Sequence, residues 1–426
     1  MIGRIEALNY RSLRHVNQDL GPFSILVGAN ASGKSTFLDV VAFLGHLVSE
    51  GLEAAVDSRT RNFHDLVWGR TGDHFELAVE APIPAEIAET GKTRFGAVRY
   101  EVKIGLKPDP HELAILTEKA LLLAPEEKPR TEKTQGLFPG YIRPPTTILT
   151  GRAPSNARAV IIKTEAGIDQ YDEENPAHGR KGWKTRVKWG ARKSALGHLP
   201  ADESKFPVVS WLRGLLTEGV RSLALDSRAL RLASPPGKRH GFQADGSYLP
   251  WAITNLKQTA HDRYRDWISH LRTALEDLED VEIVERQDDR HAYLMLVYKS
   301  GLKVPSWTTS DGTLRLLALT LLAYSGDFRG AYLIEEPENG VHPLAVDAMY
   351  QSLSTVYDAQ VLLATHSPVI LGLADPDTVL CFAKTDQGET DIVVGSRHPA
   401  LTDWRGETNL GVLFAAGVLG ETGDQR

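Results

Sequence analysis

The spacing of apolar residues predicts strands and helices at both ends of the chain. Residues 2–8 and 23–27 are short apolar runs rich in β-branched residues, which is typical of strands. Residues 28–34 form a glycine-bearing loop, and apolar residues recur with helical spacing over 35–47. Later in the chain, strands predicted at 331–334, 360–364 and 378–382 alternate with helices predicted at 313–324 and 343–357. This alternation indicates a parallel sheet covered by helices on both faces.

The middle of the chain has a different pattern. Residues 108–200 carry many Pro, Gly and charged residues between short strand-like pieces, which predicts a β-rich insertion. One long amphipathic helix is predicted from Pro250, because apolar residues recur every three or four positions at Ile253, Leu256, Ala260, Tyr264, Trp267, Leu271, Leu275 and Leu278. Segments 281–284 and 292–297 then alternate as a hairpin would.

These patterns divide the chain into four expected parts. Residues 1–106 form the N-terminal half of a core, and residues 107–300 an insertion that is first β-rich and then helical. Residues 301–395 form the C-terminal half of the core, and residues 396–426 a tail.

Composition narrows the classes of protein that remain. The chain has 426 residues, of which 42% are hydrophobic and 24% charged, so we expect a sizeable core. Its net charge of −7 requires any nucleic-acid site to be a local patch. The single cysteine, Cys381, fits a reducing cytosol. The sequence carries no secretory signal and no apolar run long enough to span a bilayer, so we expect a cytoplasmic protein without a membrane segment.

The loop at residues 28–35 matches the phosphate-loop formula G-x4-G-K-[ST] and is followed by Thr36. Glycines in such a loop allow successive backbone N–H groups and the next helix N-terminus to point at phosphates. Lys34 would supply a positive charge to the β- and γ-phosphates, and the Ser35 hydroxyl would ligate Mg²⁺. The flanking strand and helix favour this interpretation over a chance glycine turn. The expected nucleotide-binding residues are Gly28, Asn30, Gly33, Lys34, Ser35 and Thr36.

Two carboxylates, Glu335 and Glu336, end an apolar strand. Ligands of open α/β sheets bind at this edge, and alternation along a strand predicts that the two acids face different directions. We expect Glu335 to hold magnesium or its waters, and Glu336 to polarise the attacking water. Alone, such a pair is also typical of a solvated loop.

Two further motifs have both a structural and a functional interpretation. His366 follows the buried strand at 360–364; a histidine in this position is more often structural, and its role as a γ-phosphate sensor depends on the first two motifs. Ser310, Asp311 and Gly312 precede an apolar helix, which Ser310 or Asp311 would cap. The functional interpretation is an anion site aimed at the nucleotide of another subunit.

These four motifs, in this order, resemble those of ABC-type ATPases of the SMC, RecF and OLD group, and are most similar to stand-alone bacterial AAA-family proteins with an ABC-like core. The resemblance covers residues 1–50 and 300–395, with short stretches of weaker similarity, such as residues 225–231, between them. It implies a Walker A loop at 28–36, a signature motif at 310–313, a Walker B position at Glu335, a catalytic glutamate at Glu336, a D-loop region at 338–342 and a switch histidine at His366.

The resemblance also implies a fold, cofactors and a partner. The expected fold is an α/β ABC-type P-loop head with a mostly parallel core sheet, an antiparallel β subdomain and a large α+β insertion. Its cofactors are ATP and Mg²⁺. Two heads of this family sandwich two ATP molecules, each signature motif completing the site of the other head, so a homodimer or a larger even assembly is implied.

Two positions depart from the family pattern. No glutamine occurs between Gln18 and Gln135, so the Q-loop glutamine is absent, and another residue such as His64, or a water, would take its place. The signature reads Ser-Asp-Gly-Thr instead of Ser-Gly-Gly-Gln, which would alter the contact between heads or slow turnover.

Three functions remain open. The first is the ATPase switch subunit of a bacterial genome-maintenance or phage-defence system, which controls a separate effector such as a nuclease. The second is a RecF-like, ATP-gated DNA clamp or loader, and the third a nucleotide-gated scaffold with little turnover. The candidate DNA contact is Lys184, Arg186 and Lys188, which would share one face of a strand, although the acidic stretch at 169–174 would pair with them across a hairpin.

Overall fold

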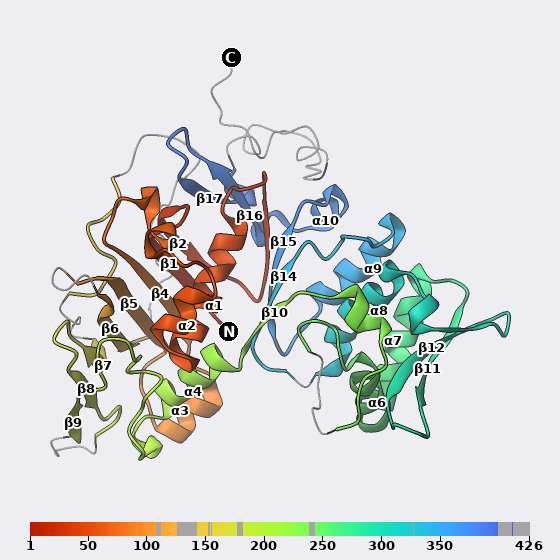
Figure 1. Ribbon diagram of the computed structural model, residues 1–426, viewed down its shortest axis with the longest axis horizontal. Helices are drawn as coiled ribbons and strands as arrows, with labels where there is room; N and C mark the ends of the chain where they lie inside the picture. Colours follow the sequence, from red (N-terminus) through yellow and green to blue (C-terminus); the bar gives the residue numbers. More distant parts are fainter. Residues whose placement is uncertain are drawn as a thin grey trace.

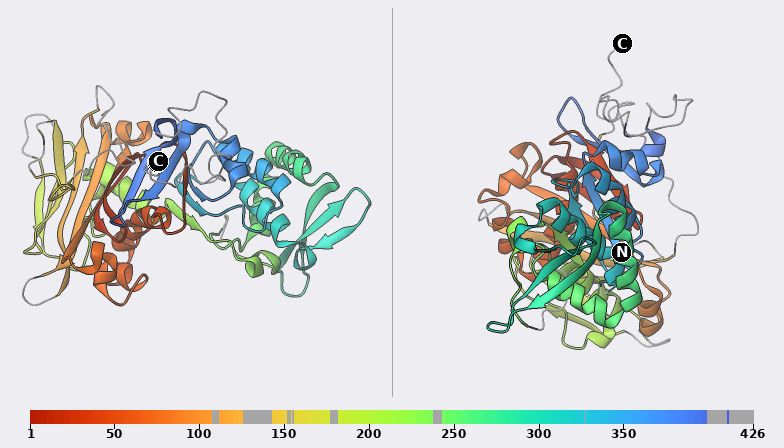
Figure 2. Two further views of the ribbon diagram at one scale, coloured as in Figure 1. Left: turned by 90° about the horizontal axis from the view of Figure 1, so that it is seen from above. Right: turned by 90° about the vertical axis from the view of Figure 1, so that its right-hand side faces the viewer.

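The computed structural model describes residues 1–107, 112–125, 143–151, 154, 156–176, 182–237, 243–326, 328–398 and 411. Two large sheets lie side by side with helix α1 (Lys34–Ser49) between them, and a group of helices covers the far face of the second sheet (Figure 1). A small third sheet lies at the end of the molecule farthest from the first sheet (Figure 2). Among the described residues, none of the helices is long and apolar enough to cross a bilayer.

The first sheet is antiparallel and has eight strands in the order β2-β1-β4-β5-β6-β7-β8-β9. In that order they are Leu13–Asp19, Arg4–Tyr10, His74–Pro82, Ala97–Leu106, Leu113–Leu123, Ala157–Lys163, Asp169–Asp172 and Lys184–Val187. β5 pairs with β6, so the sheet continues across residue 107. Strands β6 to β9, which the sequence predicts as part of an insertion, therefore extend the sheet that the N-terminal strands form. The four-part division of the chain stays a prediction.

The second sheet has the order β10-β14-β15-β3-β16-β17. In that order its strands are Val220–Leu223, Ala331–Glu335, Gln360–Thr365, Phe23–Gly28, Val379–Lys384 and Thr390–Val394. The first five are mutually parallel and β17 is antiparallel. Alternate residues of β3 face opposite sides: Leu26 packs in the core around α1, whereas Ile25 and Val27 pack in the core beneath the other helices. Burial on both faces explains why these strands are continuously apolar.

The helices and the third sheet complete the fold. The remaining α-helices are α2 (Leu52–Asp57), α3 (Ala85–Gly91), α4 (Pro207–Thr217), α5 (Ser227–Arg231), α6 (Leu249–Thr259), α7 (His261–Ala274), α8 (Asp311–Ser325), α9 (Pro343–Ser354) and α10 (Pro368–Leu373). The third sheet joins β11 (Leu278–Glu285), β12 (Ala292–Tyr298) and β13 (Lys303–Pro305), which confirms the predicted hairpin. Short 3-10 helices include η1 (Phe63–Leu66), η2 (Trp68–Arg70) and η4 (Ser306–Thr308).

The prediction of one long helix after Pro250 is wrong. The chain leaves the helical conformation at Ala260, with φ −146° and ψ 66°, and α7 starts at the next residue. Leu278, the last position of the predicted stripe, begins β11. The apolar spacing does not reveal the break, because the helical period of buried residues is the same before and after it: Leu256 and Tyr264 are both buried. The break brings the Tyr264 hydroxyl within 2.9 Å of the Val281 carbonyl, which ties α7 to β11.

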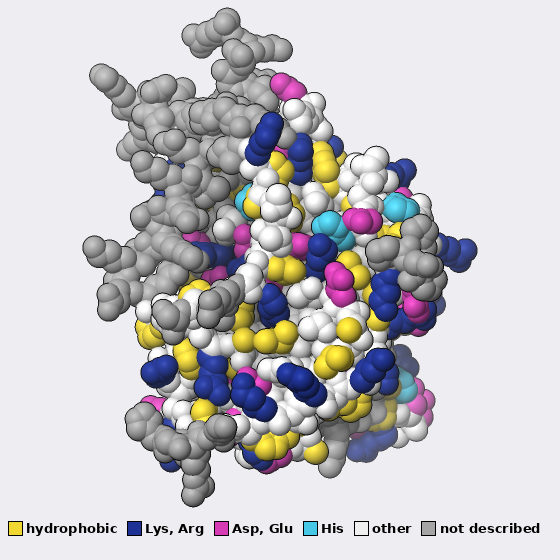
Figure 3. All heavy atoms as spheres, turned by 90° about the vertical axis from the view of Figure 1, so that its left-hand side faces the viewer, with side chains coloured by type: hydrophobic (Ala, Val, Ile, Leu, Met, Phe, Trp, Pro, Cys, Tyr) yellow, Lys and Arg dark blue, Asp and Glu magenta, His cyan; other side chains and the backbone are white. Residues whose placement is uncertain are grey.

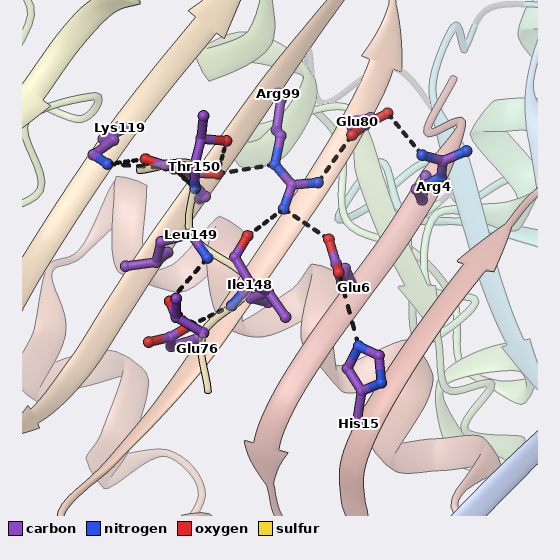
Figure 4. Close-up of polar contacts among 12 residues, drawn as sticks. Arg4, Glu6, His15, Glu76, Glu80, Arg99, Lys119, Ile148, Leu149 and Thr150 are labelled. Atoms are coloured by element: carbon purple, nitrogen blue, oxygen red, sulfur yellow. Dashed lines mark hydrogen bonds and ion pairs between the residues drawn. The ribbon is translucent and has the colours of Figure 1, made fainter. Parts of the chain in front are cut away.

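A network of charged groups covers the outer face of the antiparallel sheet (Figure 4). The Arg99 guanidinium on β5 donates to Glu6 at 2.7 Å, to Glu80 at 2.9 Å and to Glu101 at 2.9 Å. Burial alone would lower the pKa of Arg99, but Glu6 and Glu101 outweigh burial and raise this pKa. Glu101 is fully buried, and its charge is compensated by Arg99 and by Lys119, whose Nζ lies 3.8 Å from Glu101 Oε1.

A segment without regular structure, residues 147–150, seals this network from solvent. Glu76 accepts the Ile148 N–H at 2.8 Å, and Glu101 accepts the Thr150 N–H at 2.8 Å. Arg99 donates in turn to the Ile148 carbonyl at 2.9 Å. The segment is therefore held by charge-assisted hydrogen bonds rather than by strand pairing.

Candidate active site

The phosphate-loop motif lies between β3 and α1, as predicted. Gly33 has φ 107°, in the region that favours glycine, and α1 begins directly after it at Lys34. The Phe37 N–H donates to the Gly33 carbonyl at 2.8 Å, which leaves the three preceding N–H groups without a partner inside the helix. Orphan N–H groups at a helix N-terminus form a ready anion site.

One cavity of about 460 Å³ brings the separate motifs together. The predicted residues in its wall are Asn30, Gly33, Lys34, Ser35, Thr36, Glu335, Glu336 and His366. They meet because β14, β15 and β3 are adjacent and parallel, so that their carboxyl ends share one edge of the sheet. Gly28 is not in the wall; its carbonyl accepts the Lys34 amino group at 2.8 Å from below the loop.

Lys34 is folded over its own loop. Its side-chain Nζ donates to the carbonyls of Gly28 at 2.8 Å and Ala29 at 3.1 Å, and the residue is 7% exposed. Burial lowers the pKa of Lys34, while Glu336 and Glu335 act in the opposite direction. The cation therefore stands opposite two carboxylates across the cavity that the loop borders.

Two side-chain oxygens of the kind that ligate magnesium lie side by side. The Ser35 hydroxyl donates to Glu335 Oε2. A hydroxyl and one carboxylate suit Mg²⁺, which usually keeps several waters and takes further oxygens from phosphates. Ser32 Oγ, also in the wall, is buried and has no hydrogen-bond partner among the described residues. The Ser32 hydroxyl, the first N–H groups of α1 and the adjacent oxygens of Ser35 and Glu335 together fit a magnesium-bound polyphosphate.

Glu336 adopts a backbone conformation that is rare for residues other than glycine. Its φ is 47°, its N–H donates to the Ala364 carbonyl at 2.7 Å, and its carboxylate accepts the Asn339 amide. Such a conformation costs on the order of 1–3 kcal/mol and persists only where the surroundings hold it. The two acids do face different groups, but a left-handed turn contributes to this difference in addition to strand alternation. Glu336 Oε1 consequently lies 3.9 Å from His366 Nε2.

Glu338 holds the loop that carries His366. Its Oε1 accepts the Thr365 hydroxyl at 2.7 Å and the His366 N–H at 2.9 Å. Burial lowers the pKa of His366, and Lys34 lowers it further, whereas Glu336 and Glu338 raise it. The net shift is downward from 6.5, which favours the neutral imidazole at pH 7. Glu338 lies in the predicted D-loop region, and no sequence pattern indicates this positioning contact.

The cavity wall also contains residues that the motifs did not indicate. They are Arg11 and Ser12 in the turn after β1, Asp65, Val67, Gly69 and Arg70 around η1 and η2, and Lys384 at the end of β16. Ala31 and Ser32 of the phosphate loop and Ala364 on β15 complete the wall. The Arg11 N–H donates to the Leu66 carbonyl at 2.9 Å, which joins the turn to η1. His64, suggested in place of the absent glutamine, is not in the wall, whereas Asp65 is and pairs with Arg70 at 3.1 Å.

Comparison with known proteins gives a partial family match and a fold. The sequence profile of the family described as "AAA domain, putative AbiEii toxin, Type IV TA system" matches residues 165–372, which include the signature, Glu335, Glu336 and His366 but not the phosphate loop. No curated protein matches the chain.

Solved structures of SMC heads share the arrangement of the chain. An SMC head bound to the C-terminal winged-helix domain of ScpA is 13% identical, covers 92% of this chain and 97% of its own, and superposes with a TM-score of 0.52. The chain has the fold of an SMC head. The predicted fold class is thereby confirmed. Two further SMC heads, from Pyrococcus furiosus and Thermotoga maritima, are 12% and 10% identical, cover 92% of this chain and 95% and 98% of their own, and have TM-scores of 0.48 and 0.38.

The predicted signature residues, Ser310, Asp311 and Gly312, lie outside the cavity wall of their own chain. Ser310 caps α8 by accepting the Thr313 N–H at 3.2 Å. A Cβ on Gly312 would lie 2.1 Å from the Gly340 carbonyl oxygen, so the backbone of residue 340 approaches too closely for a side chain at this position. Asp311 pairs with Arg231 on α5 at 2.8 Å, which places the stretch of weaker similarity at 225–231 directly against the signature.

The predicted basic stripe lies on β9, the edge strand of the first sheet, and on Lys188 directly after it. Lys184, Arg186 and Lys188 are exposed, whereas Trp183, Val187 and Trp189 pack against the core, as predicted. The hairpin with the acidic stretch also forms, and Asp172 pairs with Lys184 at 2.6 Å. Lysine and arginine side chains are spread over this side of the molecule (Figure 3). Arg180 and Lys181, at the start of the basic stretch, lie outside the described residues.

Proposed function

We propose that this head binds Mg·ATP at the cavity and hydrolyses it. One observation carries the proposal: Lys34, Ser35, Glu335, Glu336 and His366 line a single cavity although they come from three separate strand ends. Lys34 and the orphan N–H groups bind and orient the phosphates. Ser35 and Glu335 hold the magnesium ion, which neutralises phosphate charge when bound. Glu336 takes the proton of the attacking water, and neutral His366 hydrogen-bonds the γ-phosphate.

Replacing Lys34 with alanine tests nucleotide binding directly. We expect Lys34→Ala to weaken Mg·ATP binding by at least about tenfold, because charge-assisted hydrogen bonds to the phosphates are lost. Isothermal titration calorimetry measures the affinity. Lys303→Ala is the matched control, since Lys303 pairs with Glu282 on the third sheet. A folded Lys34→Ala protein with wild-type affinity contradicts the phosphate-loop assignment.

We propose that a second copy of the chain completes each site. Support comes from the signature residues, which do not reach the cavity of their own chain. Large apolar side chains are also exposed beside the signature and the D-loop region: Leu232 at 56%, Trp307 at 47% and Leu344 at 80%. Exposed apolar groups that flank functional motifs are typical of an interaction surface.

Ser310→Arg tests the pairing. We expect the variant to bind Mg·ATP with wild-type affinity, since Ser310 is outside the cavity, but to lose ATP-dependent pairing and most ATPase activity because a bulky cation replaces the helix cap. Light scattering and phosphate release measure the two effects. Ser354→Arg, at the exposed end of α9, is the control. Unchanged pairing and activity in Ser310→Arg argue against a shared site.

We propose further that the head is the switch subunit of a bacterial genome-maintenance or phage-defence system and controls a separate effector such as a nuclease. The resemblance to stand-alone AAA-family proteins supports this role. Light scattering on the hydrolysis-deficient Glu336→Gln protein, with and without Mg·ATP and duplex DNA, tests it. Pairing that requires ATP but is unchanged by DNA favours an effector switch. An assembly whose mass is the same with and without ATP contradicts a nucleotide-gated switch.

A direct contact with DNA is the second candidate, and the stripe on β9 is the observation that favours it. Arg186 and Lys188 are exposed and have no acidic partner among the described residues, so the hairpin leaves them available for phosphates. If DNA binds there, changing Lys184, Arg186 and Lys188 to alanine lowers the slope of log affinity against log salt by up to about three. Fluorescence anisotropy with duplex DNA measures the slope. Alanine at Lys257, Lys299 and Lys303 provides the control, and an unchanged slope removes β9 as the contact.

A further inference from the structure

The phosphate loop rests on a residue that is distant in sequence. Thr390, the first residue of β17, is 4% exposed, and its Oγ1 donates to the Ser32 carbonyl at 2.9 Å across 358 residues of chain. A Cβ on Gly33 would lie 2.2 Å from the same Oγ1. Gly33 therefore has a second reason to be glycine besides its positive φ: a larger residue would push the loop off Thr390.

The hydrogen bond to Ser32 also sets the direction of a neighbouring donor. In a planar trans peptide, the carbonyl of one residue and the N–H of the next point in opposite directions. When Thr390 holds the Ser32 carbonyl, the Gly33 N–H points away from Thr390. This N–H is one of the backbone donors that a phosphate-binding loop uses, so the hydroxyl of Thr390 fixes the orientation of a phosphate donor without touching the phosphate.

A second segment of the cavity wall meets the same residue. Thr390 Oγ1 lies 3.1 Å from Ser12 Oγ, and the Thr390 N–H donates to the Ser12 carbonyl at 3.0 Å. Ser12 is in the cavity wall. Thr390 thus joins the turn after β1 to the phosphate loop, and a movement of one requires a movement of the other.

The hairpin formed by β16 and β17 is itself held in place. β16 pairs with β3 along its length, and a Cβ on Gly28 would lie 2.2 Å from the Phe382 carbonyl oxygen. Glu389, just before β17, pairs with Arg14 on β2. The hairpin contacts both sheets and provides a fixed support for Thr390.

We propose that Thr390 is a positioning residue of the nucleotide site: its hydroxyl orients the Ser32–Gly33 peptide so that the loop is ready for phosphate before nucleotide arrives. The proposal rests on the proposed binding of Mg·ATP. A preformed loop loses less free energy on binding than one that must be ordered by the ligand, so the hydroxyl contributes to affinity rather than to the chemical step.

Removing the hydroxyl while keeping the shape of the side chain tests this role. We expect Thr390→Val to raise the Kd and the KM for Mg·ATP by about three- to tenfold, the effect of one hydrogen bond, and to leave kcat within about twofold. Thr390→Ser keeps the hydroxyl and should restore affinity to within about twofold of wild type. Thr378→Val is the control, because the Thr378 hydroxyl also donates to a backbone carbonyl, that of Asp375 at 2.7 Å, outside the cavity wall. Urea unfolding without nucleotide shows whether each variant folds normally.

The possible outcomes distinguish a failure of the positioning role of Thr390 from a failure of the proposed Mg·ATP binding. Affinity lost in Thr390→Val, kept in Thr390→Ser and unrelated to the urea midpoint supports positioning. Wild-type affinity in Thr390→Val, or equal loss in both variants, overturns it while Mg·ATP binding by the wild-type protein stands. A wild-type protein that binds no Mg·ATP overturns both.

Discussion

Glu336→Gln should hydrolyse ATP roughly a hundredfold or more slowly than wild type, the usual loss when a general base is removed, while binding Mg·ATP nearly as tightly. An amide has the shape of the carboxylate but cannot take a proton from the attacking water. The substitution preserves the local structure, because glutamine can occupy φ 47° at a similar cost and can still accept from Asn339. Phosphate release measures turnover, and calorimetry measures binding.

The control is Glu276→Gln, which removes an exposed carboxylate in the turn between α7 and β11. It should leave both turnover and affinity unchanged. If Glu336→Gln hydrolyses at the wild-type rate, Glu336 is not the base and its strained backbone needs another explanation. If instead the variant loses Mg·ATP binding, Glu336 contributes chiefly to the metal or phosphate contacts.

Arg99→Ala should lower the free energy of unfolding by about 3–5 kcal/mol, the typical loss when one partner of a buried ion pair is removed. The substitution leaves Glu6, Glu80 and Glu101 without their shared cation, and Glu101 is fully buried. It also removes the donor to the Ile148 carbonyl, so residues 147–150 lose part of their attachment. Urea unfolding at pH 7 measures the loss.

Arg213→Ala is the matched control, because its guanidinium pairs with Glu203 near the surface at 2.9 Å. It should cost about 1 kcal/mol or less. Combining Arg99→Met with Glu101→Gln should recover part of the stability, since the fully buried carboxylate that loses its nearest cation is then absent. A loss below about 1 kcal/mol in Arg99→Ala would show that solvent reaches the three carboxylates and that the network is not buried in solution.

Features encoded by neighbouring residues could be predicted from the sequence. The phosphate loop, the Ser310 cap and the exposed basic side chains of β9 each depend on contiguous residues, whose conformation follows from local sterics and strand alternation. The apolar runs of β3, β14 and β15 identified a sheet buried on both faces, and parallel pairing then brought Lys34, Glu336 and His366 to one edge. The fold class, and the grouping of the predicted nucleotide-site residues at one sheet edge, could therefore largely be predicted from the sequence.

The tertiary structure alone decided what depends on contacts distant in sequence. The break at Ala260 keeps the apolar phase, so periodicity cannot reveal it. Glu336 turns left-handed within a hydrogen-bonded loop, which strand alternation does not anticipate. The hydrogen bond from Thr390 to the Ser32 carbonyl joins residues 358 positions apart, and no local sequence pattern indicates which threonine contacts which carbonyl. Local sterics specify elements and motifs, whereas packing between elements specifies which side chains complete the site.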